Sequence, residues 1–187
     1  MNTLPADRFR PATLGLGGNL GDPVKSMAAA LRKLDGRDDC RLTAVSRLYR
    51  TPPWGKTDQS FFFNACAALH TLLEPEALLD VCLGIERDMK RERIERWGPR
   101  TLDIDLLTFD DIEQGAPRLE LPHPRMTERG FVLMPLADFA ADLIVKGRTV
   151  ADWLSRADIQ GIEIADADRE WWRSASNEKA AENPPLG

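Results

Sequence analysis

Cysteine is scarce in this chain of 187 residues, which contains only three copies. Cys40, Cys66 and Cys82 form no C-x-x-C pair. An odd number of unpaired cysteines argues against a disulfide framework or a zinc site. We therefore expect three small hydrophobic side chains, buried in a protein of the reducing cytosol.

Long hydrophobic runs are lacking too. No stretch of about 18 apolar residues, the length that spans a membrane, occurs in the sequence. Residues 131–145 come nearest, but Pro135, Asp138 and Asp142 interrupt them. Residues 1–11 carry several charges and no apolar core, so they do not resemble a secretory signal. We expect a cytoplasmic protein without a membrane partner.

An excess of positive charge is also missing. The net charge of -5 and a pI near 5.2 argue against broad binding of nucleic acids, which requires a basic surface. They allow a nucleotide ligand, because a local basic patch or a bound cation suffices for one. The 43% of hydrophobic and 29% of charged residues are ordinary for a globular domain, and the length suits a single core.

The alternation of apolar and polar residues predicts the element order β-α-β-β-α-β. The expected strands cover residues 12–17, 42–50, 61–72 and 101–109, and the expected helices cover residues 23–35 and 75–90. This order is typical of an α+β, ferredoxin-like fold, an antiparallel sheet with both helices packed on one face. Small C-terminal additions follow, with a strand near residues 119–121 and helices near residues 132–140 and 150–156.

The chain is expected to fold as one domain over residues 12–164. Residues 1–11 are expected to form a flexible N-terminus. Residues 165–187 are polar and end in Asn-Pro-Pro-Leu-Gly, so we expect a C-terminal tail that is partly disordered.

Two aspartates on the fourth expected strand carry the sharpest chemical signal. Asp103 and Asp105 lie two residues apart, so their side chains leave the same face of the strand, roughly 6.5–7 Å apart at the backbone. Carboxylates this close repel each other unless a cation lies between them. Magnesium is commonly held by one or two carboxylates together with substrate phosphates. Taken alone, the pair would more often mark the exposed face of an edge strand, and the neighbouring residues reverse that preference.

These neighbours are basic. Residues 87–100 hold six basic and three acidic residues, a local balance of +3 in an acidic chain. The end of a helix would explain Arg87, Lys90 and Arg91, because cations suit its carbonyl groups. It does not explain Arg100, which lies beyond a Gly-Pro break and close to the two aspartates. Arginines that face a metal held by carboxylates are suited to a triphosphate.

Two further groups of residues suit a nucleotide and a flat heterocycle. Two prolines flank His123 on an expected loop, and with Arg129 it forms a second set of donors for phosphate. Phe62 and Asn64 share a strand face, so a ring and an amide point into the same space. A heterocycle could stack on the ring and pair with the amide. A lone histidine or phenylalanine is more often structural, so these groups count only in combination.

Taken together, these residues resemble the 6-hydroxymethyl-7,8-dihydropterin pyrophosphokinases, from about residue 14 to residue 140. The motifs in chain order are Gly17–Asp22, Tyr49–Pro53, Phe63–Ala65, Arg96–Asp105, Pro122–Pro124 and Arg129–Phe131. The resemblance implies transfer of pyrophosphate from ATP to 6-hydroxymethyl-7,8-dihydropterin, giving AMP and the pterin diphosphate for folate biosynthesis. It also implies a monomer with two magnesium ions. The tail that includes Trp171 and Trp172 has no counterpart in this resemblance.

The resemblance also implies roles for individual residues. Asp103 and Asp105 would hold both metal ions and would act in catalysis together with Arg91 and Arg100. The implied ATP contacts are Glu86, Arg91, Arg93, Trp97, Arg100, Leu106, His123 and Arg129, with Lys90 as an alternative to Arg91. The implied pterin contacts are Thr51, Pro53, Trp54, Phe62, Asn64 and Phe131.

Two other functions fit parts of the pattern. A different magnesium-dependent nucleotidyl- or phosphotransferase on the same scaffold would release pyrophosphate or ADP in place of AMP. An RNA-binding module shares the element order and requires aromatic side chains on a basic sheet face. Asp103 and Asp105 would place negative charge on that face, so we expect no nucleic-acid partner.

Overall fold

The computed structural model describes residues 8–53, 60–89 and 101–173. Its main sheet is built of β1 (Arg10–Gly18), β2 (Cys40–Val45), β3 (Leu48–Thr51), β4 (Phe62–Thr71), β5 (Asp103–Phe109) and β10 (Glu163–Asp166). The strands follow the order β10-β3-β4-β1-β5, and β2 also pairs with β4. The pairings are all antiparallel. Two small ribbons join β6 (Gln114–Gly115) to β7 (Glu120–Leu121) and β8 (Ile144–Val145) to β9 (Arg148–Thr149).

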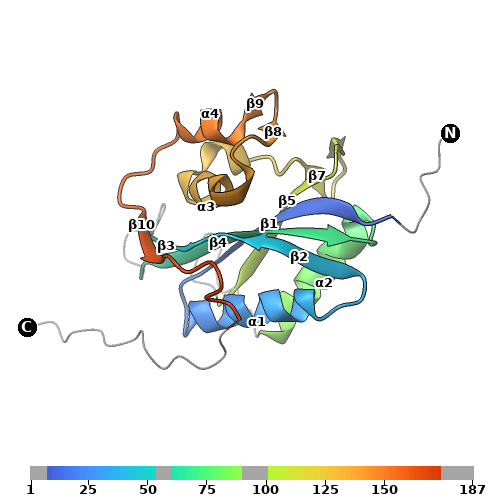
Figure 1. The fold of residues 1–187 in the computed structure, drawn as a ribbon, viewed down its shortest axis with the longest axis horizontal. Helices are drawn as coiled ribbons and strands as arrows, with labels where there is room; N and C mark the ends of the chain where they lie inside the picture. Colours follow the sequence, from blue (N-terminus) through green and yellow to red (C-terminus); the bar gives the residue numbers. More distant parts are fainter. Residues whose placement is uncertain (1–7, 54–59, 90–100, 174–187) are drawn as a thin grey trace, which may run out of the picture.

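Helices cover both faces of the sheet (Figure 1). The first face carries α1 (Pro23–Asp35) and α2 (Pro75–Asp88), and the opposite face carries α3 (Gly130–Ala140) and α4 (Val150–Leu154). A short 3-10 helix, Met126–Glu128, precedes α3. The buried side chains fall into two clusters accordingly, one between the sheet and α1 and α2, the other between the sheet and α3 and α4.

The side chains of β5 alternate between these two layers. Ile104 and Leu106 join the cluster beneath α1 and α2, whereas Leu107 joins the cluster beneath α3. The register between β1 and β5 shifts after Leu106, which leaves Leu107 as an extra residue and lets neighbouring leucines enter opposite layers. Asp103 and Asp105, at the start of β5, line the same cavity as Phe131 and Val132 of α3.

The two helices of the first layer begin as their sequences predict. Proline occupies the first position of each, Pro23 in α1 and Pro75 in α2, where a missing N–H costs no hydrogen bond. The side chain of Asp22 accepts a hydrogen bond from the backbone N–H of Lys25 and so caps α1. These local signals fix where the two helices begin.

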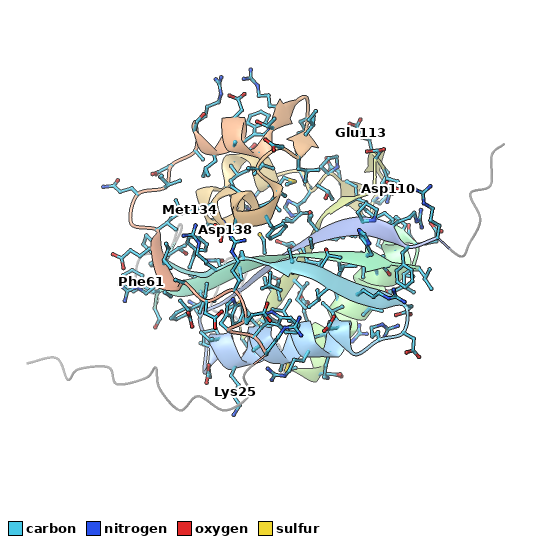
Figure 2. The ribbon with its side chains drawn as sticks, viewed as in Figure 1. Lys25, Phe61, Asp110, Glu113, Met134 and Asp138 are labelled. Carbon is cyan, nitrogen blue, oxygen red and sulfur yellow. The ribbon has the colours of Figure 1, made fainter. Side chains whose placement is uncertain are left out.

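The α+β class, with an antiparallel sheet and packed helices, is confirmed. The expected strand 42–50 is wrong in one respect, since it is two strands, β2 and β3. Ser46 and Arg47 interrupt it because their polar groups bind elsewhere. The Ser46 hydroxyl accepts a hydrogen bond from the N–H of Cys66 (2.9 Å), and the N–H of Arg47 donates to the carboxylate of Asp138 on α3 (2.9 Å). Figure 2 shows Asp138 between α3 and the sheet.

Both expected domain boundaries need correction. Strand β1 begins at Arg10, inside the expected flexible N-terminus, and β10 crosses the expected boundary at residue 164. Trp171 and Trp172 are only 8% and 3% exposed, packed in the layer that holds α1. Residues 165–173 therefore belong to the folded body, because two buried indoles and a strand pairing hold them there. Residues 174–187 lie outside the described part of the chain.

The remaining expectations for the fold concern cysteines and membranes. Cys40, Cys66 and Cys82 are free and buried, as the sequence predicts. Within the described residues, no helix has the length and apolar character needed to cross a bilayer.

Candidate active site

Two glycines in β1 open a space on the α3 face of the sheet. Gly17 pairs with Asn64 of β4 on one side and with Asp103 of β5 on the other, and Gly15 pairs in the same way with Cys66 and Asp105. Since neighbouring strands lie about 4.8 Å apart, the backbones of Asn64 and Asp103 lie roughly two strand spacings apart. Because no side chain rises from β1 between them, the middle strand forms the floor of a cavity.

This first cavity, named here the Asn64 cavity, joins strands β1, β3, β4 and β5 to the start of α3. Its lining residues are Gly15, Leu16, Gly17, Thr51, Pro52, Phe62, Asn64, Ala65, Cys66, Asp103, Asp105, Arg129, Phe131 and Val132. The structure thus brings together four of the six residues that the sequence suggested for pterin, Thr51, Phe62, Asn64 and Phe131. Pro52, and not Pro53, lines the cavity, and Trp54 lies outside the described residues.

The amide of Asn64 has a fixed orientation at the base of this cavity. Its Nδ2 donates a hydrogen bond to Oγ1 of Thr51 at 2.8 Å, and both residues are buried. A Cβ on Gly17 would lie 2.9 Å from Oδ1 of Asn64, closer than such atoms approach, so glycine is needed beside this amide. The carboxamide therefore stands ready to pair with the edge of a bound ring.

Aromatic and cationic side chains complete the walls. Phe62 comes from β4 and Phe131 from the first turn of α3, so the two rings reach the Asn64 cavity from different elements. The guanidinium of Arg129 lies 5.7 Å from the centre of the Phe131 ring, within the range of a cation–π contact. The cavity thus offers ring faces, a fixed amide and charge, which suits a flat polar heterocycle.

A second cavity, named the Glu86 cavity, lies on the other side of the two aspartates. It is lined by Leu79, Leu83, Glu86, Asp103, Ile104, Asp105, Leu106, Ala116, Pro117, Arg118, Leu119, Glu120, His123 and Pro124. It gathers three residues that the sequence suggested for ATP, namely Glu86, Leu106 and His123. Asp103 and Asp105 line both cavities, so the two spaces meet at this pair of carboxylates.

Glu86 also has a structural contact within this region. Its side chain is 2% exposed, and its Oε1 accepts a hydrogen bond from the N–H of Ile104 at 2.7 Å. Ile104 lies between the two aspartates on β5. The carboxylate on α2 therefore holds the segment of β5 that presents Asp103 and Asp105.

Asp105 is surrounded by cationic and polar groups. Its Oδ2 lies 3.6 Å from Nη1 of Arg129 and 3.9 Å from Nε2 of His123. Burial lowers the pKa of His123 below its usual value, although the nearby Asp105 opposes the shift. The backbone N–H of His123 donates to the carbonyl of Leu107 at 2.8 Å, and its Nδ1 accepts from the N–H of Arg125 at 3.2 Å. These contacts hold the ring beside β5.

The residues expected from the basic segment, Arg91, Arg93, Trp97 and Arg100, lie outside the described part of the chain, as does the alternative Lys90. Within the described part, no group of three or more histidine, cysteine, aspartate or glutamate residues gathers as a ready-made metal cage. Two carboxylates at a cavity junction still suit magnesium, which prefers oxygen ligands and takes others from phosphates and water.

Sequence reasoning missed several lining residues. Gly15, Gly17, Cys66 and Val132 line the Asn64 cavity. The glycines and Val132 have no reactive group that would single them out, and Cys66 was expected only as a buried hydrophobic side chain. A signal for the glycines existed, because glycine inside a strand often marks a place where a ligand or another backbone comes close. The contribution of Val132 could not be seen, since it depends on how α3 docks over the sheet.

Comparisons with known proteins agree with the geometry. A family model described as 7,8-dihydro-6-hydroxymethylpterin-pyrophosphokinase (HPPK) matches residues 13–141. A 2-amino-4-hydroxy-6-hydroxymethyldihydropteridine pyrophosphokinase of Methylorubrum extorquens is 48% identical over 152 residues, which cover 81% of this chain and 96% of the relative. A protein of the same name from Pseudomonas aeruginosa is 45% identical over 151 residues, 80% of this chain and 93% of the relative.

Solved structures support the fold as well. The wild-type HPPK-DHPS of Plasmodium falciparum, crystallised with STZ-DHP, matches with a TM-score of 0.64 at 17% sequence identity. The match covers 80% of this chain and 43% of that longer chain. The chain belongs to the 7,8-dihydro-6-hydroxymethylpterin-pyrophosphokinase family, and it is an ATP-dependent pyrophosphokinase of folate biosynthesis, as its motifs predicted.

Proposed function

We propose that Asp103 and Asp105 mark the place where the pyrophosphoryl group passes from ATP to 6-hydroxymethyl-7,8-dihydropterin. The observation that carries this proposal is that both carboxylates line both cavities. The pterin would occupy the Asn64 cavity, and the phosphates of ATP would occupy the Glu86 cavity. Ligands that fill the two spaces would approach each other across the two carboxylates.

The pterin assignment is supported by the chemistry of the first cavity. A pterin has a flat ring system with hydrogen-bond donors and acceptors along one edge. Asn64 can match both kinds of group, because an amide has an acceptor oxygen and a donor nitrogen. Its Nδ2 already donates to Thr51, which fixes the amide before a ligand arrives. Phe62 and Phe131 would cover the ring faces.

The two aspartates fit magnesium, and we propose that they hold two ions together with the phosphates of ATP. When bound, magnesium neutralises phosphate charge and polarises the attacking hydroxyl oxygen. The chain itself would align the two substrates, since phosphoryl-type transfer depends mainly on position and charge. Arg129 and His123 stand beside Asp105 and would contact phosphate oxygens. On sequence grounds Arg91, Arg93 and Arg100 would add to them, with Trp97 bordering the nucleotide.

Other expectations also remain proposals. We infer that the sheet has a ferredoxin-like frame, because β1, the β2–β3 pair, β4 and β5 alternate with α1 and α2 in the expected order. We further propose a cytoplasmic monomer that binds small molecules and no nucleic acid. The acidic net charge of -5 supports the last point.

A product assay tests the proposed reaction. The full chain is mixed with ATP, magnesium and 6-hydroxymethyl-7,8-dihydropterin, and AMP, ADP and free pyrophosphate are followed over time. We expect AMP and the pterin diphosphate to rise in equal amounts, and neither to form when the pterin is omitted or magnesium is chelated. Formation of ADP, or release of free pyrophosphate, would instead support the competing transferase reactions.

A further inference from the structure

We propose that residues 157–173, named here the C-terminal strap, position the two opposite walls of the Asn64 cavity and so set its fit to the pterin. This inference rests on the proposed placement of the pterin in that cavity. The strap contributes no residue to the lining of either cavity, and it begins well after residue 141, where the match to the family model ends. Its action would therefore be indirect, through the elements that it contacts.

The first contact is with the start of α3. A Cβ on Gly130 would overlap the carbonyl oxygen of Asp158, and it would lie 3.2 Å from Cγ2 of Ile159. The strap backbone thus packs directly on Gly130, between two residues that line the cavity, Arg129 and Phe131. Only glycine permits so close an approach, which ties the position of this wall to the strap.

The second contact is with the opposite wall, formed by β3 and Pro52. The backbone of Gly161 has a φ of +75°, and a Cβ there would lie 3.1 Å from Cγ of Pro52. Immediately afterwards β10 pairs with β3, with Glu163 opposite Arg50 and an ion pair between them at 2.5 Å. The strand that carries Thr51 to the cavity therefore has β4 on one side and the strap on the other.

The end of the strap is anchored on the other face of the sheet. Nε1 of Trp171 donates a hydrogen bond to the carbonyl of Ser46 at 3.0 Å, and the carbonyl of Trp172 accepts one from Arg32 of α1 at 2.6 Å. Between these anchors and the cavity, Arg169 donates to the carbonyl of Asp138 on α3 at 3.0 Å. Figure 1 shows the chain running from α4 along β3 and down toward α1.

One continuous segment thus contacts the α3 wall, the β3 wall and a buried anchor. If the anchor is lost, the strap is no longer held against the two walls, and it no longer fixes the distance between them. A ring that must fit between Phe62 and Phe131 is sensitive to that separation, because small displacements of positioning groups reduce catalytic rates strongly. The Glu86 cavity contains no strap contact of this kind among its described lining residues, so ATP binding should respond much less.

The test compares full-length Trp171→Ala and Gly130→Ala with controls. Trp171→Ala removes one buried ring of the anchor together with its hydrogen bond to Ser46, and Trp171→Phe keeps a large ring but lacks that hydrogen bond. Gly130→Ala pushes the strap from α3, whereas Gly115→Ala adds the same methyl group where nothing lies within 4 Å. Leu34→Ala removes a side chain from the core layer that also holds Trp171, so it reports the effect of lost stability alone. The readouts are kcat/KM for the pterin at saturating ATP, and the Kd of a non-hydrolysable ATP analogue.

We expect Trp171→Ala and Gly130→Ala to lower kcat/KM for the pterin about tenfold or more. Trp171→Ala should leave the Kd of the ATP analogue unchanged, and Trp171→Phe, which keeps the ring but loses the hydrogen bond, should restore part of the lost activity. Gly115→Ala and Leu34→Ala should behave as the wild type at a temperature where all variants are folded. Equal losses of kcat/KM in Trp171→Ala and Leu34→Ala would overturn the proposal. Wild-type pterin kinetics in both Trp171→Ala and Gly130→Ala would overturn it as well.

A parallel measurement with Asn64→Leu separates the two possible failures. If Asn64→Leu loses pterin affinity while the strap variants keep it, the cavity is correctly assigned and the strap has no positioning role. If Asn64→Leu binds the pterin as the wild type does, the assignment of the cavity fails, and the inference about the strap fails with it.

Discussion

Asn64 shows how single side chains prepare the pterin-side cavity. Its amide is buried at 7% exposure and is held by Thr51. Asn64→Leu would leave the edge of a bound pterin without its partners, at roughly 1–3 kcal/mol for each lost hydrogen bond. We expect the Kd of the pterin to rise about tenfold or more, since ~1.4 kcal/mol is tenfold in affinity.

Phe62→Tyr is the comparison for this substitution. It keeps the ring face for stacking and adds a hydroxyl group at the rim, so we expect a much smaller change in pterin affinity. Calorimetric titration of the pterin, with a non-hydrolysable ATP analogue already bound, measures both variants. Equal affinities for Asn64→Leu and the wild type would show that Asn64 is only a residue of the sheet.

Tyr49 gives a prediction about alkaline pH. Burial and the neighbouring Asp138, whose carboxylate accepts a hydrogen bond from its hydroxyl at 3.0 Å, raise the pKa of Tyr49 to about 12. An unfolded tyrosine ionises near a pKa of about 10, so the unfolded chain loses its proton first as the pH rises. This contribution to stability is complete below about pH 10 and is lost between about pH 10 and 12.

The measurement is direct because the chain contains a single tyrosine. Ultraviolet absorbance of the tyrosinate should show a midpoint near pH 12 in the folded protein and near pH 10 in denaturant. The free energy of unfolding should fall over the same range, and Tyr49→Phe should lack this part of the pH dependence. A folded-state midpoint equal to that in denaturant would contradict the proposed environment of the hydroxyl group.

At the scale of the element, β1 shapes the Asn64 cavity because Gly15 and Gly17 place no side chain in it. Gly17→Ala would place a methyl group 2.9 Å from Oδ1 of Asn64, whereas Gly15→Ala would make an ordinary contact of 3.5 Å with Leu107. Overpacking usually costs about 1–3 kcal/mol of folding stability, and here it would also displace the amide of Asn64. We therefore expect Gly17→Ala to weaken pterin binding, and Gly15→Ala to have a smaller effect. Pterin titrations of the two variants provide the check. A larger loss of pterin affinity in Gly15→Ala than in Gly17→Ala would contradict the role assigned to Gly17 beside Asn64.

An element can be predicted from the sequence when the residues that determine it lie within the element itself. The alternation in β5 predicts that Asp103 and Asp105 share a face, and the prolines predict where α1 and α2 begin. The break at Ser46 and Arg47 could not be predicted, because it depends on partners in β4 and α3. Its residues alone are compatible with a continuous strand.

At the scale of the whole molecule, the same contrast explains what was missed. The two aspartates, Asn64 and Phe62 were identified from motifs, and the structure brings them to one cavity. Residues 165–173 of the C-terminal strap were expected to belong to a polar tail, because β10 is exposed along its length and its order comes from β3 and from a distant anchor. Composition does not predict the order of such a segment, because residues far away in the sequence stabilise it.

The central claim is that Asp103 and Asp105 together form the point of transfer. The most direct measurement is the initial rate of AMP formation in Asp103→Asn and Asp105→Asn, with Asp110→Asn as the control. All three changes remove one charge at nearly constant shape, and Asp110 is exposed at the far end of β5, where its φ of 48° also suits asparagine (Figure 2).

We expect rates at least about a hundredfold lower in the first two variants, because losing a metal ligand removes several kcal/mol of transition-state stabilisation. The rate of Asp110→Asn should equal that of the wild type. Circular dichroism spectra should show that all three variants are folded. Wild-type rates in folded Asp103→Asn or Asp105→Asn would contradict the account.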